Sequence, residues 1–334
     1  MMNDTTIPPA PAKNKSWPLI ALVLFLVGFL LPILCWTFWL PKAVLFAACG
    51  AELLAFILGL VTWRRRLARI AVIGSMIFFL LGISLGRHGL PTYQQPIHPT
   101  SRWMKPLNSN WVLQSPGKTY SIQPVSDLKK NGDDSLRFEL RAGEVWVDQT
   151  FLSTFRAEVA TKEFPPVNAV RWYAFSVYFP TDFPIESNRL VFAQWKEKEG
   201  FAQRGQSPSL AFRFVNGQFA IRLLHSADRV LRDPEAVPTE KLFKSNNFAL
   251  GRWHDFVVQA KWSYQDDGLI NVWWNREPIV HYQGPVGYHA DLGPQFKFGL
   301  YRDATDNPYV AWFNQVKSGP TPQEIDFAIP SPTR

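Results

Sequence analysis

The stretch Leu-Arg-Phe-Glu-Leu-Arg, residues 136–141, alternates apolar and charged side chains without a break. In an extended chain, Leu136, Phe138 and Leu140 fall on one side, and the charged residues between them fall on the other. An amphipathic helix would instead place its apolar residues three or four positions apart. The alternation therefore predicts a β-strand with one buried face and one solvated face.

The same period of two recurs downstream, between clusters of Gly, Pro, Asn and Asp. We expect further strands at residues 171–180, 190–196, 209–224, 253–262, 269–274 and 295–302. Asn216-Gly217 predicts a tight hairpin inside the third segment, because both central positions of a type I′ turn need positive φ. About ten strands over roughly 220 residues fit two packed sheets, so we expect an all-β jelly roll, a two-sheet β-sandwich, over residues 111–334.

The N-terminal part of the chain predicts a membrane anchor. Three apolar runs approach the roughly 20 residues that a membrane-spanning helix needs, and we expect transmembrane helices at residues 16–40, 43–63 and 68–86. The second run contains Glu52, which fits a functional carboxylate or a protonated, paired one. The third follows an arginine-rich loop, residues 64–69, and such loops stay cytoplasmic. We therefore expect a cytoplasmic N-terminus and a periplasmic or extracellular C-terminal domain.

The boundary between these parts is also visible in composition. Residues 87–110 carry four prolines among polar residues, which predicts an extended linker. A cleaved signal peptide is the rival interpretation of the N-terminus. It fits less well, because the first apolar run exceeds the roughly 7–15 residues of a signal-peptide core and apolar sequence continues beyond it.

Charge and cysteine content exclude several classes of function. Residues 1–90 hold 8 basic and 2 acidic residues, whereas residues 91–334 hold 27 and 25. The basicity therefore belongs to the apolar block, and no nucleic-acid partner is expected. Cys35 and Cys49 both lie in the apolar runs. The sandwich is thus expected to be neither a disulfide scaffold nor a thiolate enzyme.

Several predicted strands carry polar side chains on one face. Residues two or four positions apart in a strand share a face, and the pairs are Lys297 with Tyr301, Gln194 with Lys196, and Arg156 with Glu158. We expect these pairs to meet on one concave sheet. Three simpler explanations stay open: a solvated strand face, a packed tyrosine with a satisfied hydroxyl, and a plain Arg–Glu pair.

The order and spacing of seven short motifs between residues 137 and 317 resemble the polysaccharide lyases of the heparin lyase I and glucuronan lyase type. The motifs are Arg-Ala-Glu-Val (156–159), Trp-Tyr-Ala-Phe-Ser-Val-Tyr-Phe-Pro (172–180), Gln-Trp-Lys (194–196), Ser-Pro-Ser-Leu (207–210), Gly-Arg-Trp-His-Asp-Phe-Val-Val (251–258), Asp-Gly-Leu-Ile-Asn-Val-Trp (267–273) and Lys-Phe-Gly-Leu-Tyr-Arg (297–302). The resemblance implies a concanavalin A-like jelly roll whose concave sheet cleaves an acidic polysaccharide by β-elimination beside a uronic acid.

The resemblance also implies roles for individual residues. A uronate C5 proton becomes removable once the carboxylate is neutralised, after which a base takes it and an acid protonates the departing O4. Tyr301 would be the base and also the acid, and Gln194 would hydrogen-bond the carboxylate. Arg156 would supply positive charge, and Lys297 would favour the phenolate. The expected substrate-binding residues are Lys196, Glu158, Arg213, Arg222, His225 and Arg302, although alternation points Arg302 away from Tyr301 unless the strand ends there.

Lys196 is a departure from the family, which often has histidine at that position. An imidazole can act as a base near neutrality, whereas an exposed lysine is mostly protonated and suits a carboxylate clamp. His225 shares a predicted hairpin with Arg213 and Arg222 and could replace the missing imidazole, or it could be an ordinary surface or core histidine. His254 lies in a motif that we interpret as structural.

Two functions therefore compete. The first is a membrane-anchored lyase acting on an acidic polysaccharide outside the cytoplasm, and the alternative is a non-catalytic, lectin-like binding module at the cell surface. A glycoside hydrolase needs two carboxylates about 5–5.5 Å apart when it retains configuration, and its nearest candidate, Glu324-Ile325-Asp326, has Ile329 where a further Glu is needed.

The expected partners are an acidic polysaccharide and the lipid bilayer, and the sequence suggests no protein partner. No cofactor is required by this chemistry. A structural calcium ion would find oxygen ligands at Asp266 with Asp267, or at Asp303 with Asp306. These residues are equally typical of turns.

Overall fold

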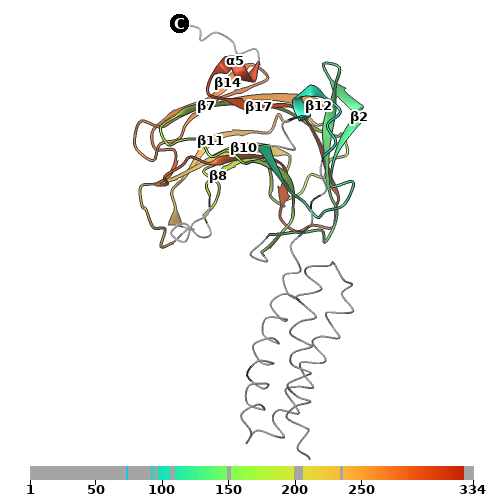
Figure 1. Cartoon of the computed structure of the whole chain (residues 1–334), viewed down its shortest axis with the longest axis horizontal. Helices are drawn as coiled ribbons and strands as arrows, with labels where there is room; N and C mark the ends of the chain where they lie inside the picture. The colour runs from blue at the N-terminus through green and yellow to red at the C-terminus, as the bar shows by residue number, and fades with distance from the viewer. Residues whose placement is uncertain are drawn as a thin grey trace, which may run out of the picture. The chain divides into compact units, whose positions relative to one another are not determined.

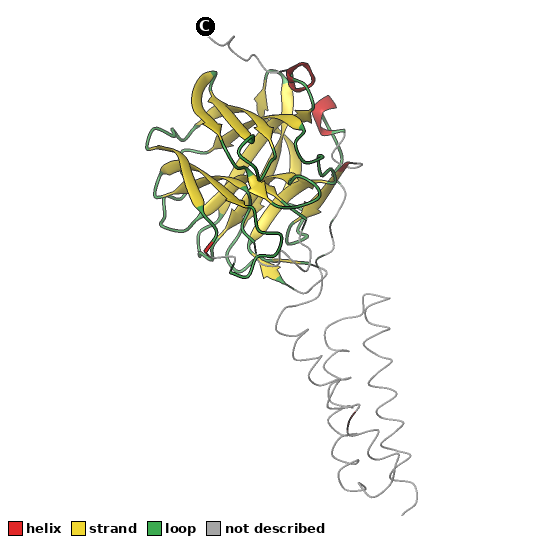
Figure 2. Ribbon diagram, turned by 90° about the vertical axis from the view of Figure 1, so that its left-hand side faces the viewer, coloured by secondary structure: helices red, strands yellow, loops and turns green. Residues whose placement is uncertain are grey.

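The computed structural model describes residues 73, 92, 94, 97–105, 110–148, 152–198, 206–233 and 236–326. Strands make up most of this part of the chain (Figure 2). The three predicted membrane helices lie outside the described residues except for Ile73, so the anchor stays a prediction. Within the described part, no helix has the length and apolar character needed to cross a bilayer.

The C-terminal domain consists of two large sheets in two layers (Figure 1). The first is an eight-stranded sheet with strand order β1 (Trp111–Gln114), β6 (Arg156–Thr161), β16 (Gln295–Arg302), β8 (Leu190–Lys196), β9 (Leu210–Val215), β10 (Gln218–Ser226) and β11 (Thr239–Ser245), with β15 (Gly287–Tyr288) beside β10. The second is a seven-stranded sheet with strand order β14 (Glu277–Gln283), β13 (Leu269–Trp274), β12 (Arg252–Lys261), β7 (Val170–Phe179), β17 (Tyr309–Gly319), β3 (Asp133–Leu140) and β2 (Ile122–Lys130).

The remaining elements are short. They are a pair of strands, β4 (Trp146–Val147) and β5 (Ser153–Thr154), a 3-10 helix, η1 (Arg102–Met104), and a helical turn, α5 (Pro322–Ile325). The last lies over β7 and β17, on the far side of the seven-stranded sheet from the eight-stranded one (Figure 1).

The two-sheet sandwich is confirmed, and every predicted segment forms strand. Residues 136–140 lie in β3, and residues 209–224 form the β9–β10 hairpin. Asn216 and Gly217 have φ of 52° and 72°, as the type I′ turn requires. The period of two succeeds here because most strands bury one face in a shared core.

That core is aromatic and lies between the two sheets. Phe296 and Phe298 of β16 face Phe175 of β7 and Phe313 of β17, with ring centroids 5.8 Å apart for Phe296–Phe175 and 5.2 Å for Phe298–Phe313. Trp195 of β8 stacks on Phe296 at 4.8 Å. Each fully buried side chain of this size contributes about 1.5–3 kcal/mol, so the apolar half of β16 fixes where its polar half points.

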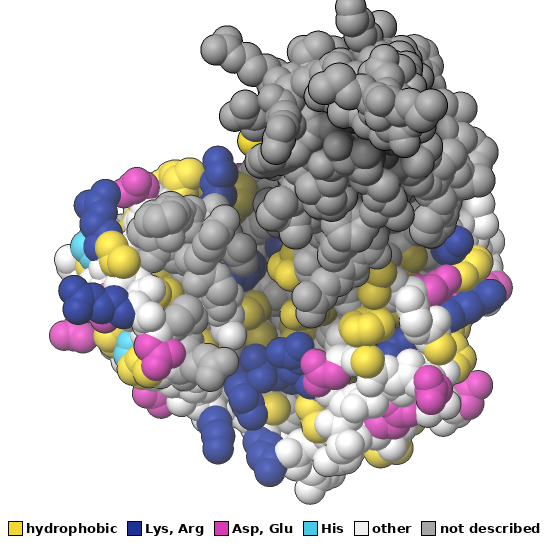
Figure 3. Space-filling model, turned by 90° about the horizontal axis from the view of Figure 1, so that it is seen from below, with side chains coloured by type: hydrophobic (Ala, Val, Ile, Leu, Met, Phe, Trp, Pro, Cys, Tyr) yellow, Lys and Arg dark blue, Asp and Glu magenta, His cyan; other side chains and the backbone are white. Residues whose placement is uncertain are grey.

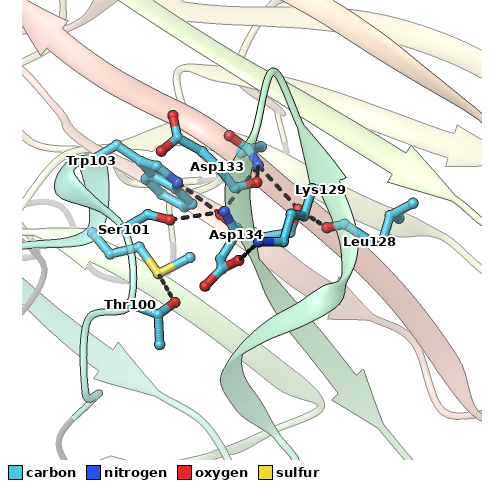
Figure 4. A network of polar contacts seen from close by, with 10 residues as sticks. Thr100, Ser101, Trp103, Leu128, Lys129, Asp133 and Asp134 are labelled. Carbon is cyan, nitrogen blue, oxygen red and sulfur yellow. Dashed lines mark hydrogen bonds and ion pairs between the residues drawn. The ribbon is translucent and has the colours of Figure 1, made fainter.

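The start of the domain corrects the predicted linker boundary. Ile97 and Met104 are buried, and the Trp103 indole N–H donates to the Asp134 carbonyl at 3.0 Å. The Asp134 amide in turn donates to the Ser101 hydroxyl at 2.8 Å (Figure 4). Residues 97–105 therefore pack on the sandwich rather than forming an extended linker. The proline-rich composition gave no sign of these few buried apolar residues, because their spacing follows neither the period of a strand nor that of a helix.

A β-bulge interrupts the pairing of β16 with β8 between Phe298 and Tyr301. Gly299 sits in this interruption with φ of +132°. A Cβ atom there would lie 2.3 Å from the Ala157 carbonyl oxygen and 2.8 Å from the Phe138 ring. Only glycine fits both the dihedral and the space, and this irregularity carries Tyr301 to its place opposite Val191.

Replacing Gly299 by alanine should destabilise the domain by at least about 1–3 kcal/mol from backbone strain, with the backbone clash adding to it. Gly143→Ala is the matched control, because Gly143 also has positive φ (+69°) but has no atom within 4 Å of the added Cβ. Urea unfolding of both variants measures the difference. Equal losses in the two proteins would contradict the close packing at Gly299.

Two buried ionisable side chains lie outside the strand-face pattern. Burial raises the pKa of Glu197 to about 7, although the Ser209 hydroxyl donates a hydrogen bond to its carboxylate. Burial lowers the pKa of His254 to about 4. The His254 ring accepts the Trp274 indole N–H at 3.0 Å and stacks on Phe248 at 3.9 Å, which confirms its structural role. Glu197 is therefore neutral in the folded state in acid, and His254 is neutral near pH 7.

Glu197→Gln should become progressively more stable relative to the unsubstituted chain as pH rises from about 5 to 8. The unfolded Glu197 loses its proton near its ordinary pKa while the folded one retains it up to pH 7, so the glutamate costs up to about 3 kcal/mol at the alkaline end. Unfolding both proteins in urea at several pH values measures this trend. A difference that does not change with pH would contradict the burial of a protonated Glu197.

Candidate active site

The candidate site lies on the face of the eight-stranded sheet that points away from the core. Strand register places Lys297 of β16 opposite Gln194 of β8, and Tyr301 of β16 opposite Arg156 of β6. Directly opposed residues share a face, so the structure brings together the four residues predicted to be catalytic. Figure 3 views this side of the molecule and shows Lys and Arg side chains gathered near its centre.

A hydrogen-bond network joins these residues through a carboxylate and an amide. The Gln194 side-chain amide donates to one oxygen of Glu158 at 2.5 Å, and Arg156 Nη1 lies 3.4 Å from the other. Arg156 Nη1 and Lys297 Nζ also donate to Gln114 Oε1, at 3.0 and 3.2 Å. Glu158 is fully buried, so its carboxylate oxygens need these neighbours as partners. The site therefore holds two cations and a donor amide in fixed positions.

The Tyr301 ring lies between two guanidinium groups. The Arg156 Cζ atom is 4.4 Å from the ring centroid, and the Arg189 Cζ atom is 5.1 Å from it. Arg189 is held in place by Asp303, whose carboxylate accepts from Arg189 Nη2 at 2.8 Å and from the Arg189 amide at 3.1 Å. Both contacts are within the range of cation–π attraction. Positive charge therefore surrounds the phenol on two sides.

A second bulge, in β8, explains how Arg189 reaches this face. Register with β9 shifts between Val191 and Ala193, and both Phe192 and Ala193 pack into the core. Two successive core-facing residues reverse the alternation, so that Val191 and Gln194 both point outward. Arg189, two residues before Val191, then lies on the same side as Gln194.

Arg189 and Gln114 are site residues that the sequence did not reveal. Arg189 precedes its strand, and period-two counting back from Gln194 would have placed it on the other face. Gln114 ends β1, a strand of only four residues, Trp111–Gln114, whose pattern is too short to interpret. Its position opposite Glu158 follows only from the β1–β6 register.

Arg213 and Arg222 extend the same face toward β10. Arg213 of β9 lies opposite Val191, and Arg222 of β10 lies opposite Ala211. Burial, followed by the nearby Arg222 and Arg189 charges, lowers the pKa of Arg213 to about 10. Lys196 shares the face of Gln194, and its ammonium donates to the Gln206 carbonyl oxygen. The structure thus places all three of these predicted binding residues on the site face.

Arg302 does not belong to the predicted binding set. It is 1% exposed, and its guanidinium donates to the carbonyls of Asp303, Thr305 and Arg141 at 3.0–3.2 Å. It also lies over the Tyr309 ring at 5.0 Å. The strand continues far enough for alternation to turn Arg302 toward the interior, so its inclusion as a substrate ligand was wrong.

His225 is also not brought to this face. His225 is three positions after Arg222, and residues an odd number of positions apart lie on opposite faces of a strand. Its Nε2 atom also lies 3.9 Å from Oε1 of Glu240, and Glu240 is the register partner of the core residue Leu223. His225 therefore takes the other side of β10. Its proposed role as a substitute for the missing imidazole is wrong for this arrangement.

The predicted calcium ligands are engaged in other contacts. Asp267 accepts from the Ser263 hydroxyl at 2.6 Å and pairs with Lys261 at 2.5 Å, and Asp303 pairs with Arg189. In the described ranges, no three His, Cys, Asp or Glu side chains are grouped to hold a metal ion. The structural calcium ion therefore stays a prediction.

The rejected hydrolase candidate, Glu324 with Asp326, lies in and just after α5. Ile325 of this turn packs with Ala174 and Val257 on the seven-stranded sheet. These acids therefore lie on the opposite side of the sandwich from the basic face, which leaves the hydrolase interpretation without support from the fold.

The arrangement on the eight-stranded sheet suits removal of a proton next to a carboxylate. It offers an amide donor and cations to receive negative charge and a phenol to exchange a proton. Comparison with known proteins leads to the same class of chemistry. A family model described as "Polysaccharide lyase" matches residues 103–317.

Individual relatives agree with this match. Heparin lyase I of Pedobacter heparinus is 23% identical over 320 residues, covering 59% of this chain and 83% of the relative. The crystal structure of endo-β-1,4-glucuronan lyase from the fungus Trichoderma reesei superposes with a TM-score of 0.54 and 18% identity, covering 66% of this chain and 96% of that one. The latter likeness supports the jelly-roll fold. The family model spans well over half of the sequence and includes every strand of the candidate site. The chain therefore belongs to the polysaccharide lyase family.

Proposed function

We propose that this protein cleaves a uronate-containing polysaccharide by β-elimination, with Tyr301 exchanging the proton. The observation that carries the proposal is the shared face of Tyr301, Gln194, Arg156 and Lys297, joined by hydrogen bonds to Glu158 and Gln114. The names of two relatives, a heparin lyase and a glucuronan lyase, support an acidic polymer as substrate.

The first requirement of the reaction is neutralisation of the uronate carboxylate. A side-chain amide has two N–H donors, and Gln194 uses one of them on Glu158. The other remains to bond the substrate carboxylate, while Arg156 and Lys297 supply positive charge beside it. Withdrawing charge from the carboxylate stabilises the enolate-like transition state that forms when C5 loses its proton.

The second requirement is a base that also returns a proton. The Tyr301 phenolate takes the C5 proton, the C5–H electron pair forms the C4–C5 double bond, and the C4–O4 bond breaks. The phenol then gives its proton to O4, which leaves the phenolate ready for another cycle. The guanidinium groups of Arg156 and Arg189 lie 4.4 and 5.1 Å from the ring centroid, so positive charge stands next to the group that exchanges the proton.

Glu158 is a positioning residue in this mechanism. Its carboxylate accepts from Gln194 and pairs with Arg156, so it fixes the position of the amide and holds the guanidinium beside the tyrosine. Because Gln194 and Arg156 engage its two oxygens, we assign Glu158 an indirect role in place of the direct substrate contact predicted from the sequence.

Lys196 favours one alternative, a binding module without catalysis. Its ammonium donates to the Gln206 carbonyl, so this side chain is engaged as a hydrogen-bond donor and not positioned as a base. If proton transfer depended on an imidazole at this position, the face would bind acidic polysaccharide without cleaving it. A Tyr301-only mechanism needs no such imidazole, and this is the point that experiment decides.

Tyr301→Phe should lose at least about a hundredfold in kcat while retaining polymer binding, since only the proton-exchanging hydroxyl is removed. The measurement is ultraviolet absorbance of the unsaturated uronate product from glucuronan, alginate and heparin-type polymers. Tyr264→Phe is the matched control. It removes a hydroxyl from a ring that stacks on His289 and does not belong to the candidate site, so this variant should retain full activity.

Two outcomes would count against this function. Undiminished turnover by Tyr301→Phe would remove the tyrosine from its role. Absence of unsaturated product across the whole panel, together with tight binding by the unsubstituted chain, would establish the non-catalytic module instead.

Gln194→Ala should lower kcat by about a hundredfold to a thousandfold, which is the usual effect of removing one donor to a developing anion. The KM should change far less, because the donor acts mainly on the transition state. Gln259→Ala of β12 is the control, since Gln259 bonds Asn271 in the other sheet. Steady-state kinetics on a polymer that the unsubstituted chain cleaves decides the point, and a loss confined to KM would assign Gln194 to ground-state binding.

A further inference from the structure

A cavity of about 360 Å³ lies on the outer face of the seven-stranded sheet, which points away from the core. Its walls come from the β2–β3 turn, from β12 and β13, from the turn that follows β13, from β17 and from the end of α5. The label α5 marks this face in Figure 1. A cavity of this size suits a small ligand rather than a second protein chain. It is separate from the candidate active site, which lies on the other sheet.

Unusual backbone conformations are concentrated around this cavity. Seven non-glycine residues of the described part have positive φ, and four of them line it: Asn131, Arg276, Gln315 and Asp326. Asparagine and aspartate adopt this conformation readily in turns and at helix ends, but arginine and glutamine do so at a steric cost. Conformations of this kind gather at ligand clamps, where the cost is balanced by a function.

Arg276 occupies a turn position at which glycine is the ordinary choice. Asn275 and Arg276 join β13 to β14 with φ of 51° and 73°, as in a type I′ turn, for which Asn-Gly is a preferred pair. The turn is fixed on β12, because the Asp255 amide donates to the Asn275 side chain at 2.9 Å and the Asn275 amide donates to the Asp255 carbonyl at 2.8 Å. The fold therefore depends on this turn and on Asn275, but not on an arginine side chain.

Gln315 lies in the irregular part of β17, where the pairing with β7 shifts between Asn314 and Lys317. Its φ is 51°, and its side-chain amide donates to the Asp133 carboxylate at 2.5 Å. A side-chain amide has a second N–H and a carbonyl oxygen, which leaves Gln315 with both donor and acceptor capacity. The second strained residue therefore also places a hydrogen-bonding group at the cavity.

Asp255 adds an acceptor to the same wall. Its Oδ1 atom receives both the Ser176 hydroxyl, at 2.7 Å, and the Lys130 ammonium, at 2.8 Å. Among the residues that the structure describes, no contact engages its Oδ2 atom. The carboxylate is thus held in place through one oxygen, while the other is left to accept from a ligand.

The charges of the cavity are balanced. Three cationic and three acidic side chains line it, namely Lys130, Arg276, Lys317, Asp133, Asp255 and Asp326. Two of the possible pairs form directly, Lys130 with Asp255 at 2.8 Å and Lys317 with Asp326 at 3.3 Å. Such a lining gives no net attraction to an anion. It favours a neutral ligand with hydroxyl groups, because each hydroxyl both donates and accepts.

An indole ring completes the lining. Trp273 of β13 is half-buried at the cavity and stacks on Trp172, with ring centroids 5.9 Å apart and an angle of 20° between the planes. The electron-rich face of an indole attracts positively polarised groups. One face of a pyranose ring presents polarised C–H groups, and the ring edge presents hydroxyls. An aromatic wall with mixed donors and acceptors therefore matches the chemistry of a sugar ring.

We propose that this cavity binds a neutral sugar ring of a glycan, which packs on Trp273 while its hydroxyls bond Arg276, Gln315 and Asp255. The inference goes beyond the proposed function, because the ligand is uncharged and none of these residues belongs to the candidate active site. The two sites lie on opposite faces of the sandwich. A neutral glycan and an acidic polymer can therefore be held at the same time.

The test is affinity electrophoresis of the full chain in native gels that contain laminarin, hydroxyethyl cellulose, galactomannan or pullulan. At least one of these neutral polysaccharides should retard the unsubstituted chain. Arg276→Gly and Gln315→Gly should each weaken that binding by about tenfold or more, which is the usual effect of losing a hydrogen bond to a charged or buried partner. Arg252→Gly is the matched control, since it removes an exposed arginine of β12 that does not have positive φ, and its binding should be unchanged.

Thermal unfolding of Arg276→Gly separates a ligand role from a structural one. Glycine relieves the steric cost of positive φ, so the melting temperature should be unchanged or higher, by up to about 4 °C, although binding is weakened. A lower melting temperature together with weaker binding would mean that Arg276 serves the fold, and would overturn its role as a ligand.

Three other outcomes would overturn the site. The first is the absence of retardation by all four neutral polysaccharides, and the second is equal retardation of the unsubstituted chain and both cavity variants. The third is binding of an oligoglucuronide, in preference to the neutral polymers, that Arg276→Gly abolishes. Cleavage of acidic polymers should be the same in Arg276→Gly as in the unsubstituted chain, so this site and the lyase proposal stand or fall separately.

Discussion

The eight-stranded sheet buries an aromatic core on one side and carries paired charged groups on the other. A regular strand meets this demand by strict alternation, but Arg189 and Gln194 are five positions apart, and strict alternation would place them on opposite faces. The bulge near Phe192 resolves this conflict, because Phe192 and Ala193 both point toward the core. Arg189 takes its orientation from this interruption, whereas Tyr301 shares the face of Lys297 by ordinary alternation. The aromatic packing between the sheets holds this interruption in place.

Much of the fold was predictable because it follows from local pattern. The strands at residues 190–196, 269–274 and 295–302 were located to the residue, and the Asn216-Gly217 turn was recognised from its dihedral requirement. Residues 97–105 were missed because isolated apolar anchors in a proline-rich segment have no period. Composition describes what a segment contains on average, and a domain boundary depends on a few contacts such as that of Trp103 with Asp134.

The candidate site was predictable only where a single strand supplies the information. Face-sharing pairs within β6, β8 and β16 were found correctly, since two positions of spacing suffice. Arg189 and Gln114 were missed because one depends on a bulge and the other on cross-strand register, neither of which a single segment reveals. His225 was assigned to the wrong side of its strand because sharing a hairpin with Arg222 was mistaken for sharing a face. Arg302 was included among the binding residues because it is basic, although strand alternation already pointed it toward the interior. Alternation was the better guide.

Glu158 shows how a buried carboxylate organises the side chains around it. It accepts from the Gln194 amide and pairs with the Arg156 guanidinium, so both side chains are fixed in place. In the proposed reaction this network would act as preorganisation, because its dipoles and charges are arranged before a substrate arrives.

Arg302 ties the strand that carries Tyr301 to the other sheet. Its guanidinium reaches across the sandwich from β16 to the carbonyl that follows β3, so the residue next to Tyr301 ties the two layers together at that point. Lysine has neither the reach in several directions nor the planar set of donors to replace it. A smaller or neutral side chain at position 302 would therefore lose the hydrogen bonds that join the two layers next to Tyr301.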